Sequence, residues 1–354
     1  MRLVHIDEIT PEMELARPLI SGGTYLLREG QSELTRYREK LRNMGIEYIY
    51  VEDEFSADIE LNESIRAETR RRGQELVQEI FSEISCQGSP DLSKAREYVR
   101  DLIDEIMHMD NVLINLQDIK TTDSYTYAHS VNVTVLSLLV GRSLELNQER
   151  MEKLGLGALT HDVGKSSLPE DILKKPGPLT DKEYEAIKEH PRLGYERLKD
   201  LPELSPTSLA VVLGHHENYQ GNGYPRGIAG DDIHLYPRIV TITDVFDALT
   251  SDRVYRERWT VRKAVDWITS RSGDKFDPEL VRHFIRYVTL YPNGTRVRLN
   301  DGREALVKEQ NESFPARPVI KIMENSGNVV DLTDKLDLII EDELTAGSCS
   351  HREG

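Results

Sequence analysis

At 354 residues the chain exceeds the usual size of a single domain, so two or three domains are expected. Its net charge of −17 argues against nucleic-acid polymers as partners, because these need a basic surface that displaces counterions. No apolar run approaches the roughly 20 residues that span a bilayer, and the first residues lack the apolar segment of a signal peptide. With only Cys86 and Cys349 as thiols, we expect a cytoplasmic protein without disulfides or membrane contact.

Residues 1–58 indicate a small module that is β-rich or of mixed α and β structure. Glycines separate short apolar runs there, a helix is expected near Ser32–Met44, and a strand at 48–51. We interpret this module as one for docking or for supporting a dimer, without chemistry of its own.

Residues 59–118 are expected to be a helical linker or dimerisation region. Apolar side chains recur there at steps of three and four, at Leu92, Ala95, Val99, Leu102, Ile106, Met109 and Leu113. This stripe could pack on the helices that follow, or it could form a homodimer through residues 91–115, and both alternatives stay open. The run Arg70-Arg71-Arg72 is interpreted as a solvated face.

A helical bundle is expected over residues 119–287, which makes the chain mainly α. Thr180 with Glu183 forms a capping box for the helix that leads to His190, and Asp277 before a proline begins a later helix. Residues 288–344 alternate short strands with turns such as Asp301-Gly302, which predicts a small antiparallel β module. The last ten residues, 345–354, are expected to be disordered.

The bundle region contains a set of residues suited to binding metal ions: His129, His161, Asp162, His190, His215, His216 and Asp244. Adjacent residues of a helix diverge by roughly 100°, so an adjacent pair can reach two different ions. Imidazole and carboxylate suit iron, manganese or zinc, and no cysteine lies nearby. Two ions bridged by a carboxylate would lie roughly 3.5–4 Å apart, an arrangement that clamps a phosphodiester and makes hydroxide from water.

Several short motifs stand in order between about Asp123 and Arg256: Tyr125-Thr126-Tyr127-Ala128-His129-Ser130, His161-Asp162-Val163-Gly164-Lys165, Lys175-Pro176-Gly177, His190-Pro191, His215-His216-Glu217, Gly221-Asn222-Gly223-Tyr224-Pro225, and Asp244-Val245-Phe246-Asp247-Ala248-Leu249-Thr250 with Arg253. With these motifs the segment resembles the HD-GYP domain, a bacterial subgroup of the HD metal-dependent phosphohydrolases. The resemblance covers somewhat over a third of the chain and implies hydrolysis of cyclic di-GMP to linear pGpG, with further cleavage to GMP left open.

The resemblance also implies which residues hold two divalent ions, iron or manganese. One ion would be bound by His129, His161 and Asp244, and the other by His190, His215 and His216. Asp162 is the expected bridging ligand, because a carboxylate has two oxygens and its neighbour His161 occupies one ion. The bridging water is the expected nucleophile, and Asp247 could orient that water or a ligand histidine.

The residues expected to bind cyclic di-GMP are assigned from their charge and from the match to the family. Lys165 could reach a phosphate oxygen as a point charge, and Arg253 and Arg256 can donate paired hydrogen bonds to the second phosphate. Tyr224 is expected to close over the substrate, although its loop could merely pack on the bundle. Asp123 could contact the ligand or simply cap a helix.

Two positions depart from the family pattern. Some members have a glutamate where this chain has Tyr125, and that glutamate can support a third ion; we therefore expect two ions here and pGpG as the main product. Gln220 stands where aspartate is usual, which removes a charge from the loop. Two other functions remain open: a catalytically weak cyclic-dinucleotide sensor that docks a partner, and hydrolysis of another cyclic dinucleotide such as cyclic GMP-AMP.

Overall fold

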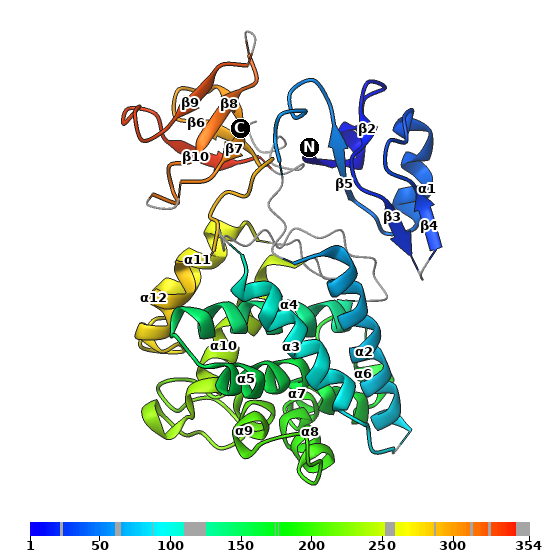
Figure 1. The fold of residues 1–354 in the computed structure, drawn as a ribbon, viewed down its shortest axis with the longest axis vertical. Helices are drawn as coiled ribbons and strands as arrows, with labels where there is room; N and C mark the ends of the chain where they lie inside the picture. The colour runs from blue at the N-terminus through cyan, green and yellow to red at the C-terminus, as the bar shows by residue number, and fades with distance from the viewer. Residues whose placement is uncertain are drawn as a thin grey trace. The chain divides into compact units, whose positions relative to one another are not determined.

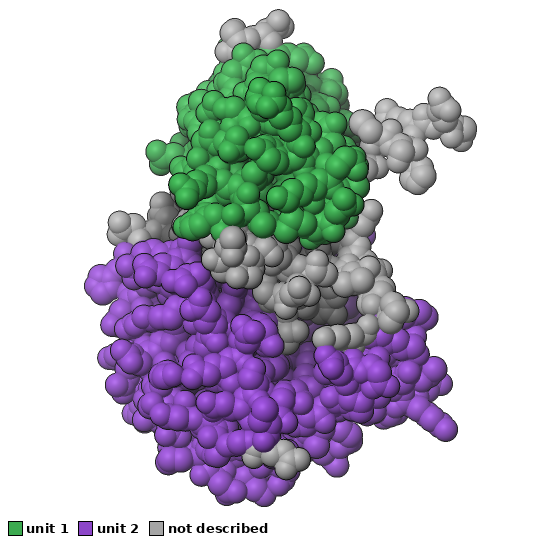
Figure 2. Space-filling model, turned by 90° about the vertical axis from the view of Figure 1, so that its right-hand side faces the viewer, with its two compact units in different colours: residues 1–63, 113–123, 289–354 green, residues 64–112, 124–288 purple. Residues whose placement is uncertain are grey.

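The computed structural model divides into two compact units, coloured in Figure 2. Unit 1 comprises residues 1–63, 113–123 and 289–354, and unit 2 comprises residues 64–112 and 124–288. Within these, the structure describes residues 1–21, 24–60, 65–86, 88–109, 125–173, 175, 177–251, 259–286, 288–311, 314–324 and 327–344. The tail predicted to be disordered, 345–354, lies outside them. Among the described residues, no helix is both long enough and apolar enough to cross a membrane.

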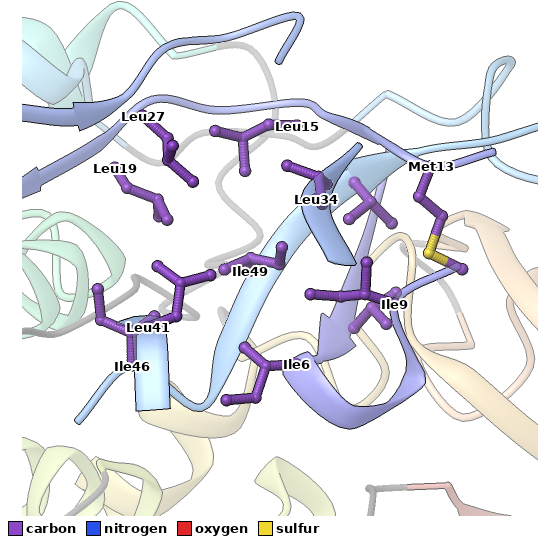
Figure 3. Close-up of a cluster of buried hydrophobic side chains, with 12 residues drawn as sticks. Ile6, Ile9, Met13, Leu15, Leu19, Leu27, Leu34, Leu41, Ile46 and Ile49 are labelled. Atoms are coloured by element: carbon purple, nitrogen blue, oxygen red, sulfur yellow. The ribbon is translucent and has the colours of Figure 1, made fainter. Parts of the chain in front are cut away.

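The first part of unit 1 is a small α+β module, as the sequence predicts. Two short antiparallel sheets, one ordered β1-β5-β2 and one pairing β3 with β4, pack with a single short α-helix. Twelve buried apolar side chains, among them Leu15, Leu41 and Ile49, form its core (Figure 3). The elements are β1 Arg2–His5, η1 Ile6–Glu8, β2 Glu14–Leu15, β3 Leu19–Ser21, β4 Thr24–Leu27, η2 Leu34–Tyr37, α1 Arg38–Asn43 and β5 Tyr48–Glu52.

The second part of unit 1 is a five-stranded antiparallel sheet of order β10-β6-β7-β8-β9. Its turns include Gly302, which has a positive φ of 88° and follows Asp301 as the sequence predicts. Asp58 forms ion pairs with Lys308 at 2.8 Å and Lys321 at 2.6 Å, which ties the two parts of the unit together. The strands are β6 Arg296–Leu299, β7 Glu304–Glu309, β8 Val319–Ile322, β9 Val329–Asp331 and β10 Ile340–Glu343.

Unit 2 is an all-helical bundle built around α4 (Figure 1). Helix α4 is buried on every side from Ala128 to Gly141, as expected of a helix without a polar face, and it packs against α2, α5 and α10. The elements are α2 Ala67–Ser85, α3 Ser93–Met107, α4 Tyr125–Ser143, α5 Gln148–Thr160, η4 Val163–Ser167, α6 Glu170–Leu173, α7 Asp181–Ile187, α8 His190–Leu198, α9 Pro206–Gly214, η5 Gly230–Asp232, α10 Leu235–Thr250, α11 Val261–Ser270 and α12 Pro278–Ile285.

The apolar stripe of residues 92–113 lies mostly in α3. Ala95, Val99, Leu102 and Ile106 are buried, and α3 packs against α4 and α5 of the same chain. The sequence left open whether this stripe packs on the bundle or forms a homodimer. Its described part packs on the bundle. A homodimer through residues 91–115 would have to use other side chains.

Candidate metal centre

The seven candidate ligands come from five helices of unit 2, and most stand where a helix begins or ends. His129 lies in α4 and Asp244 in α10. The pair His161-Asp162 directly follows the last residue of α5, and the pair His215-His216 directly follows α9. His190 is the first residue of α8. The adjacent pairs are thus placed by helix ends, where the chain turns.

Asp162 presents its two carboxylate oxygens to different histidines. Oδ2 lies 3.4 Å from His161 Nε2 and 3.8 Å from His129 Nε2. Oδ1 lies 3.3 Å from His190 Nε2 and 3.8 Å from His215 Nε2. Each oxygen therefore faces its own pair of imidazole nitrogens, which is the arrangement expected of a carboxylate that bridges two cations.

Asp244 lies close to two of the histidines. Its Oδ1 is 3.0 Å from His129 Nε2, and its Oδ2 is 4.0 Å from His216 Nδ1. Two groups of donor atoms, each with all its atoms within 4.8 Å of one another, could hold a metal ion: His129, His161 and Asp244 in one, and Asp162, His190, His215 and His216 in the other. The structure thus brings together all seven candidate ligands.

Two atoms in the cluster are available to bind a cation. His161 Nε2 and Asp162 Oδ1 are buried and have no hydrogen-bond partner in the part of the chain that the structure describes. A buried polar atom without a partner costs about 1–3 kcal/mol. Both atom types are common ligands of divalent metals, so the donor set fits such an ion.

Backbone carbonyls fix the direction of three of the imidazoles. His161 and His190 each place Nδ1 at 2.7 Å from the carbonyl oxygen three residues earlier, and His215 Nδ1 lies 3.1 Å from two such oxygens in the last turn of α9. Because a carbonyl only accepts, Nδ1 carries the proton and donates it. Nε2 is then left with a lone pair that faces the cluster.

His129 is held in the same way by a carboxylate. Its Nδ1 donates to Asp247 Oδ2 at 2.7 Å, and Asp247 Oδ1 accepts from Asn132 Nδ2 at 2.8 Å. Of the two roles considered for Asp247, the orientation of a ligand histidine is the one this geometry favours. Asn132 was not a candidate in the sequence; its only signal is a spacing of three from His129, which puts both on one helix face.

The charges inside the cluster suit cation binding. Burial lowers the pKa of His216 to about 3 and that of His215 well below its usual range. Burial raises the pKa of Asp162, but Lys165 and His161 outweigh it and hold this pKa well below its usual range. Burial lowers the pKa of His129, yet its carboxylate partners raise it to about 9. Ionised carboxylates therefore lie among imidazoles, two of which resist protonation.

A loop carries Tyr224 over this cluster. The Tyr224 ring stacks on His216, with ring centroids 4.7 Å apart and an interplanar angle of 28°. Buried Glu217 holds the loop, because its carboxylate accepts from the backbone N–H groups of Arg226 at 2.8 Å and Gly227 at 3.0 Å. A Cβ at Gly223 would lie 2.3 Å from a backbone nitrogen, so this position needs glycine. The sequence motif contains Glu217, but its spacing gave no sign of this anchoring role.

The remaining candidates are placed less completely. Lys165 is part-exposed, and its ammonium group forms an ion pair with Asp162 at the edge of the cluster. Asp123, Arg253 and Arg256 lie outside the described residues. The backbone N–H of Gln220 donates to the Asp274 carbonyl oxygen at 2.9 Å, so the loop is held there by its main chain.

Comparison with known proteins agrees with this fold and cluster. A family model described as HD domain matches residues 111–280. A cyclic di-GMP phosphodiesterase of Pseudomonas aeruginosa, PA4108, is 35% identical over 282 residues, which are 79% of this chain and 68% of the relative. The chain belongs to the HD domain family. The resemblance read from its motifs is thereby confirmed.

A second relative and a solved structure extend the comparison of this HD domain. The 3'3'-cGAMP-specific phosphodiesterase 3 of Vibrio cholerae is 37% identical over 171 residues, 48% of this chain but only 36% of that protein. Bd1817, an HD-GYP-type protein of Bdellovibrio bacteriovorus, matches with a TM-score of 0.50 and 15% identity, over 80% of this chain and 97% of that chain. At that identity the second match supports the fold alone: a mainly helical HD bundle, as predicted.

Proposed function

We propose that this chain is a phosphodiesterase that hydrolyses cyclic di-GMP to linear pGpG at a centre of two divalent cations, iron or manganese. The observation that carries the proposal is the orientation of Asp162, whose two oxygens face different histidines at 3.3–3.8 Å. The similarity to PA4108 supports cyclic di-GMP as the substrate. A complete set of seven ligands argues against a sensor that has lost catalysis.

Two bound cations would supply Lewis acidity toward a phosphate oxygen and would lower the pKa of a water molecule. The side chains around the ions orient the ligand histidines and contact the substrate. The buried carboxylate of Asp247 keeps the imidazole of His129 directed into the cluster, and the ring of Tyr224 stacks on the ring of His216. The ammonium group of Lys165 stands beside Asp162, where it can donate to a phosphate oxygen of the substrate.

Arg253 and Arg256 complete the proposed binding site as donors to the second phosphate, and Asp123 as a contact to the ligand or its helix. These three roles rest on the match of sequence to the family. Together with Lys165, the arginines supply local positive charge in a protein whose net charge is −17.

The proposal is tested on the purified 354-residue chain. Metal content is measured by elemental analysis after anaerobic purification, and products are separated by chromatography after incubation with cyclic di-GMP. We expect two ions per chain and pGpG. A chain that binds metal but only retains intact cyclic di-GMP would be a sensor, and a chain without metal would contradict the whole proposal.

The second candidate substrate is cyclic GMP-AMP. It is favoured by one observation, the 37% identity to a cGAMP-specific phosphodiesterase of Vibrio cholerae. The two substrates share their phosphodiester ring and differ in one purine. A comparison of kcat/KM for both on the same preparation decides between them, and a preference for the mixed dinucleotide would overturn our assignment of substrate.

A further inference from the structure

Arg70 lies in the first turns of α2 and reaches the buried interior of the bundle. Its Nη1 donates to Asn132 Oδ1 at 3.0 Å, and Asn132 is 1% exposed. Its neighbours in the same arginine run behave differently: Arg71 pairs with Glu75 on its own helix, and Arg72 pairs with Asp101 in α3, both at the surface. The solvated face predicted for the run therefore describes Arg71 and Arg72, and Arg70 departs from it.

The hydrogen bonds of Asn132 continue from Arg70 to a candidate metal ligand. A guanidinium can only donate, so the amide of Asn132 must turn its oxygen toward Arg70. Its NH2 group then faces Asp247 and donates to Oδ1 at 2.8 Å. The other oxygen of Asp247 accepts from His129 Nδ1 at 2.7 Å. A continuous chain of donors and acceptors thus runs from α2 through α4 and α10 to His129.

We infer that Arg70 is a positioning residue for the metal centre, acting through Asn132 and Asp247 on His129. The fixed amide keeps one carboxylate oxygen of Asp247 occupied and the other directed at the imidazole, and hydrogen bonds in such a buried chain strengthen one another. The orientation of His129 Nε2 toward Asp244 and Asp162 then depends on a residue in another helix. The inference rests on the metal centre of the proposed function and adds a residue to it.

The inference predicts a specific loss of metal affinity. Groups that hydrogen-bond a metal ligand contribute about 10–100-fold to affinity for the ion. We therefore expect Arg70→Gln to lower the affinity for one of the two ions by at least about tenfold. The affected ion is the one held by His129, because only His129 is oriented by the hydrogen bonds from Arg70 through Asn132 and Asp247. Arg70→Lys keeps a positive donor and should recover part of that affinity. Arg71→Gln, one residue away and paired at the surface, is the matched control and should bind as the wild type does.

The experiment titrates the metal-free full-length protein with Mn²⁺, and with Co²⁺ to record the visible ligand-field bands. Thermal unfolding is measured beside it. We expect Arg70→Gln to show one weakened Mn²⁺ site and altered Co²⁺ bands at a melting temperature close to that of Arg71→Gln. At saturating Mn²⁺ the KM of the variant for cyclic di-GMP should equal the wild-type value. As the Mn²⁺ concentration is lowered, the kcat of the variant should fall before that of the wild type.

Two outcomes overturn the inference alone. One is an Arg70→Gln variant with wild-type Mn²⁺ affinity and Co²⁺ bands. The other is equal weakening of both ions together with a lowered melting temperature, which would make Arg70 a residue of general stability. If Arg70→Gln fails to fold, Arg70→Lys answers the question: its ammonium keeps a donor but only part of the guanidinium contact, so its Mn²⁺ affinity should lie below that of the wild type, and wild-type affinity would count against the inference. A wild-type protein that binds no Mn²⁺ would instead refute the proposed function itself.

Discussion

Gly164 lies against the main chain of His190, so closely that a Cβ atom at Gly164 would stand 1.9 Å from the His190 carbonyl oxygen. Gly164 is the second residue of η4, which begins directly after Asp162, and His190 begins α8. Asp162 and His190, two candidate ligands far apart in sequence, are therefore brought together by a backbone contact that only glycine allows. The glycine after the His-Asp pair has this steric reason, in addition to any part in a turn.

Gly164→Ala is expected to separate these two ligands. An added methyl group with no room costs about 3 kcal/mol of stability, and the displacement should remove the ion that His190 helps to hold. Elemental analysis and thermal unfolding check both effects. Gly214→Ala is the matched control, because that glycine ends α9 beside His215 and its Cβ would make only ordinary contacts, the nearest at 3.4 Å. Normal metal content in Gly164→Ala would contradict the prediction.

Asp162→Ala and His161→Ala are expected to abolish hydrolysis and to lower the bound metal. Asp162 faces four imidazoles through its two oxygens, so its loss should affect both ions, whereas His161→Ala should affect one first. The fall in kcat should exceed about a hundredfold, since even groups behind the ligands contribute up to that much. His108→Gln, a lone histidine at the end of α3, is the control. Full activity with full metal content in either variant would refute a two-metal centre.

The sequence predicted this set of candidate ligands because adjacent pairs such as His161-Asp162 are visible in it and because several motif blocks stand in the order of the HD-GYP pattern. Helix ends place the two members of a pair, whereas the packing of five helices brings the pairs together. The links behind the ligands were not predictable in this way. The bond from Asn132 to Asp247 joins residues 115 positions apart, and that from Arg70 to Asn132 joins residues 62 apart. Such pairs appear only once helices pack, since neither residue type is distinctive alone.

The fold shows the same division between local and tertiary signals. The capping box of Thr180 and Glu183 and the cap at Asp277 are confirmed, because each depends on side chains within three residues of a helix start. The apolar stripe in α3 predicted which face of the helix is buried. It did not predict against which helices that face packs, because helical periodicity shows only that a face is apolar. Packing against α4 and α5 supplies the answer.

Lys165→Ala and Arg253→Ala are expected to raise KM while the metal stays bound. Both carry charge toward phosphates and neither is a ligand type for a cation. A charge-assisted hydrogen bond is worth about 1.5–3 kcal/mol, so each change should raise KM roughly tenfold or more. Steady-state kinetics beside elemental analysis measure this, with Lys153→Ala as the control because its ammonium pairs with Glu149 at the surface. Loss of metal in the Lys165 variant would show that its role is misassigned.

Glu217→Gln is expected to loosen the loop that carries Tyr224. The amide replaces one acceptor oxygen by an NH2 group, which then faces a backbone N–H of Arg226 or Gly227. Leaving that part-buried donor without an acceptor costs about 1 kcal/mol. We expect a raised KM and faster proteolysis within the loop, with the metal retained because no ligand changes. A variant with unchanged KM and unchanged proteolysis would show that Tyr224 needs no such anchor.

Tyr125 decides, in our interpretation, how many ions the chain binds and how far hydrolysis proceeds. It stands one helical turn before His129 in α4, where some HD-GYP proteins have a glutamate that supports a third ion. A phenol has a pKa of about 10 and supplies a single oxygen, so it is a poor ligand near neutral pH. We therefore expect two ions per chain and pGpG as the product that accumulates.

Tyr125→Glu is expected to add the missing carboxylate, and with it a third ion and faster release of GMP. The measurements are metal stoichiometry after anaerobic purification and chromatography of products over a long incubation. Tyr127→Glu is the positional control. Residues 125 and 129 are four apart and share one face of the helix, whereas residue 127 lies on a different face, so the same charge there should not add a ligand. Three tightly bound ions in the wild type, or its efficient conversion of cyclic di-GMP to GMP, would show that a third site exists without a carboxylate at this position.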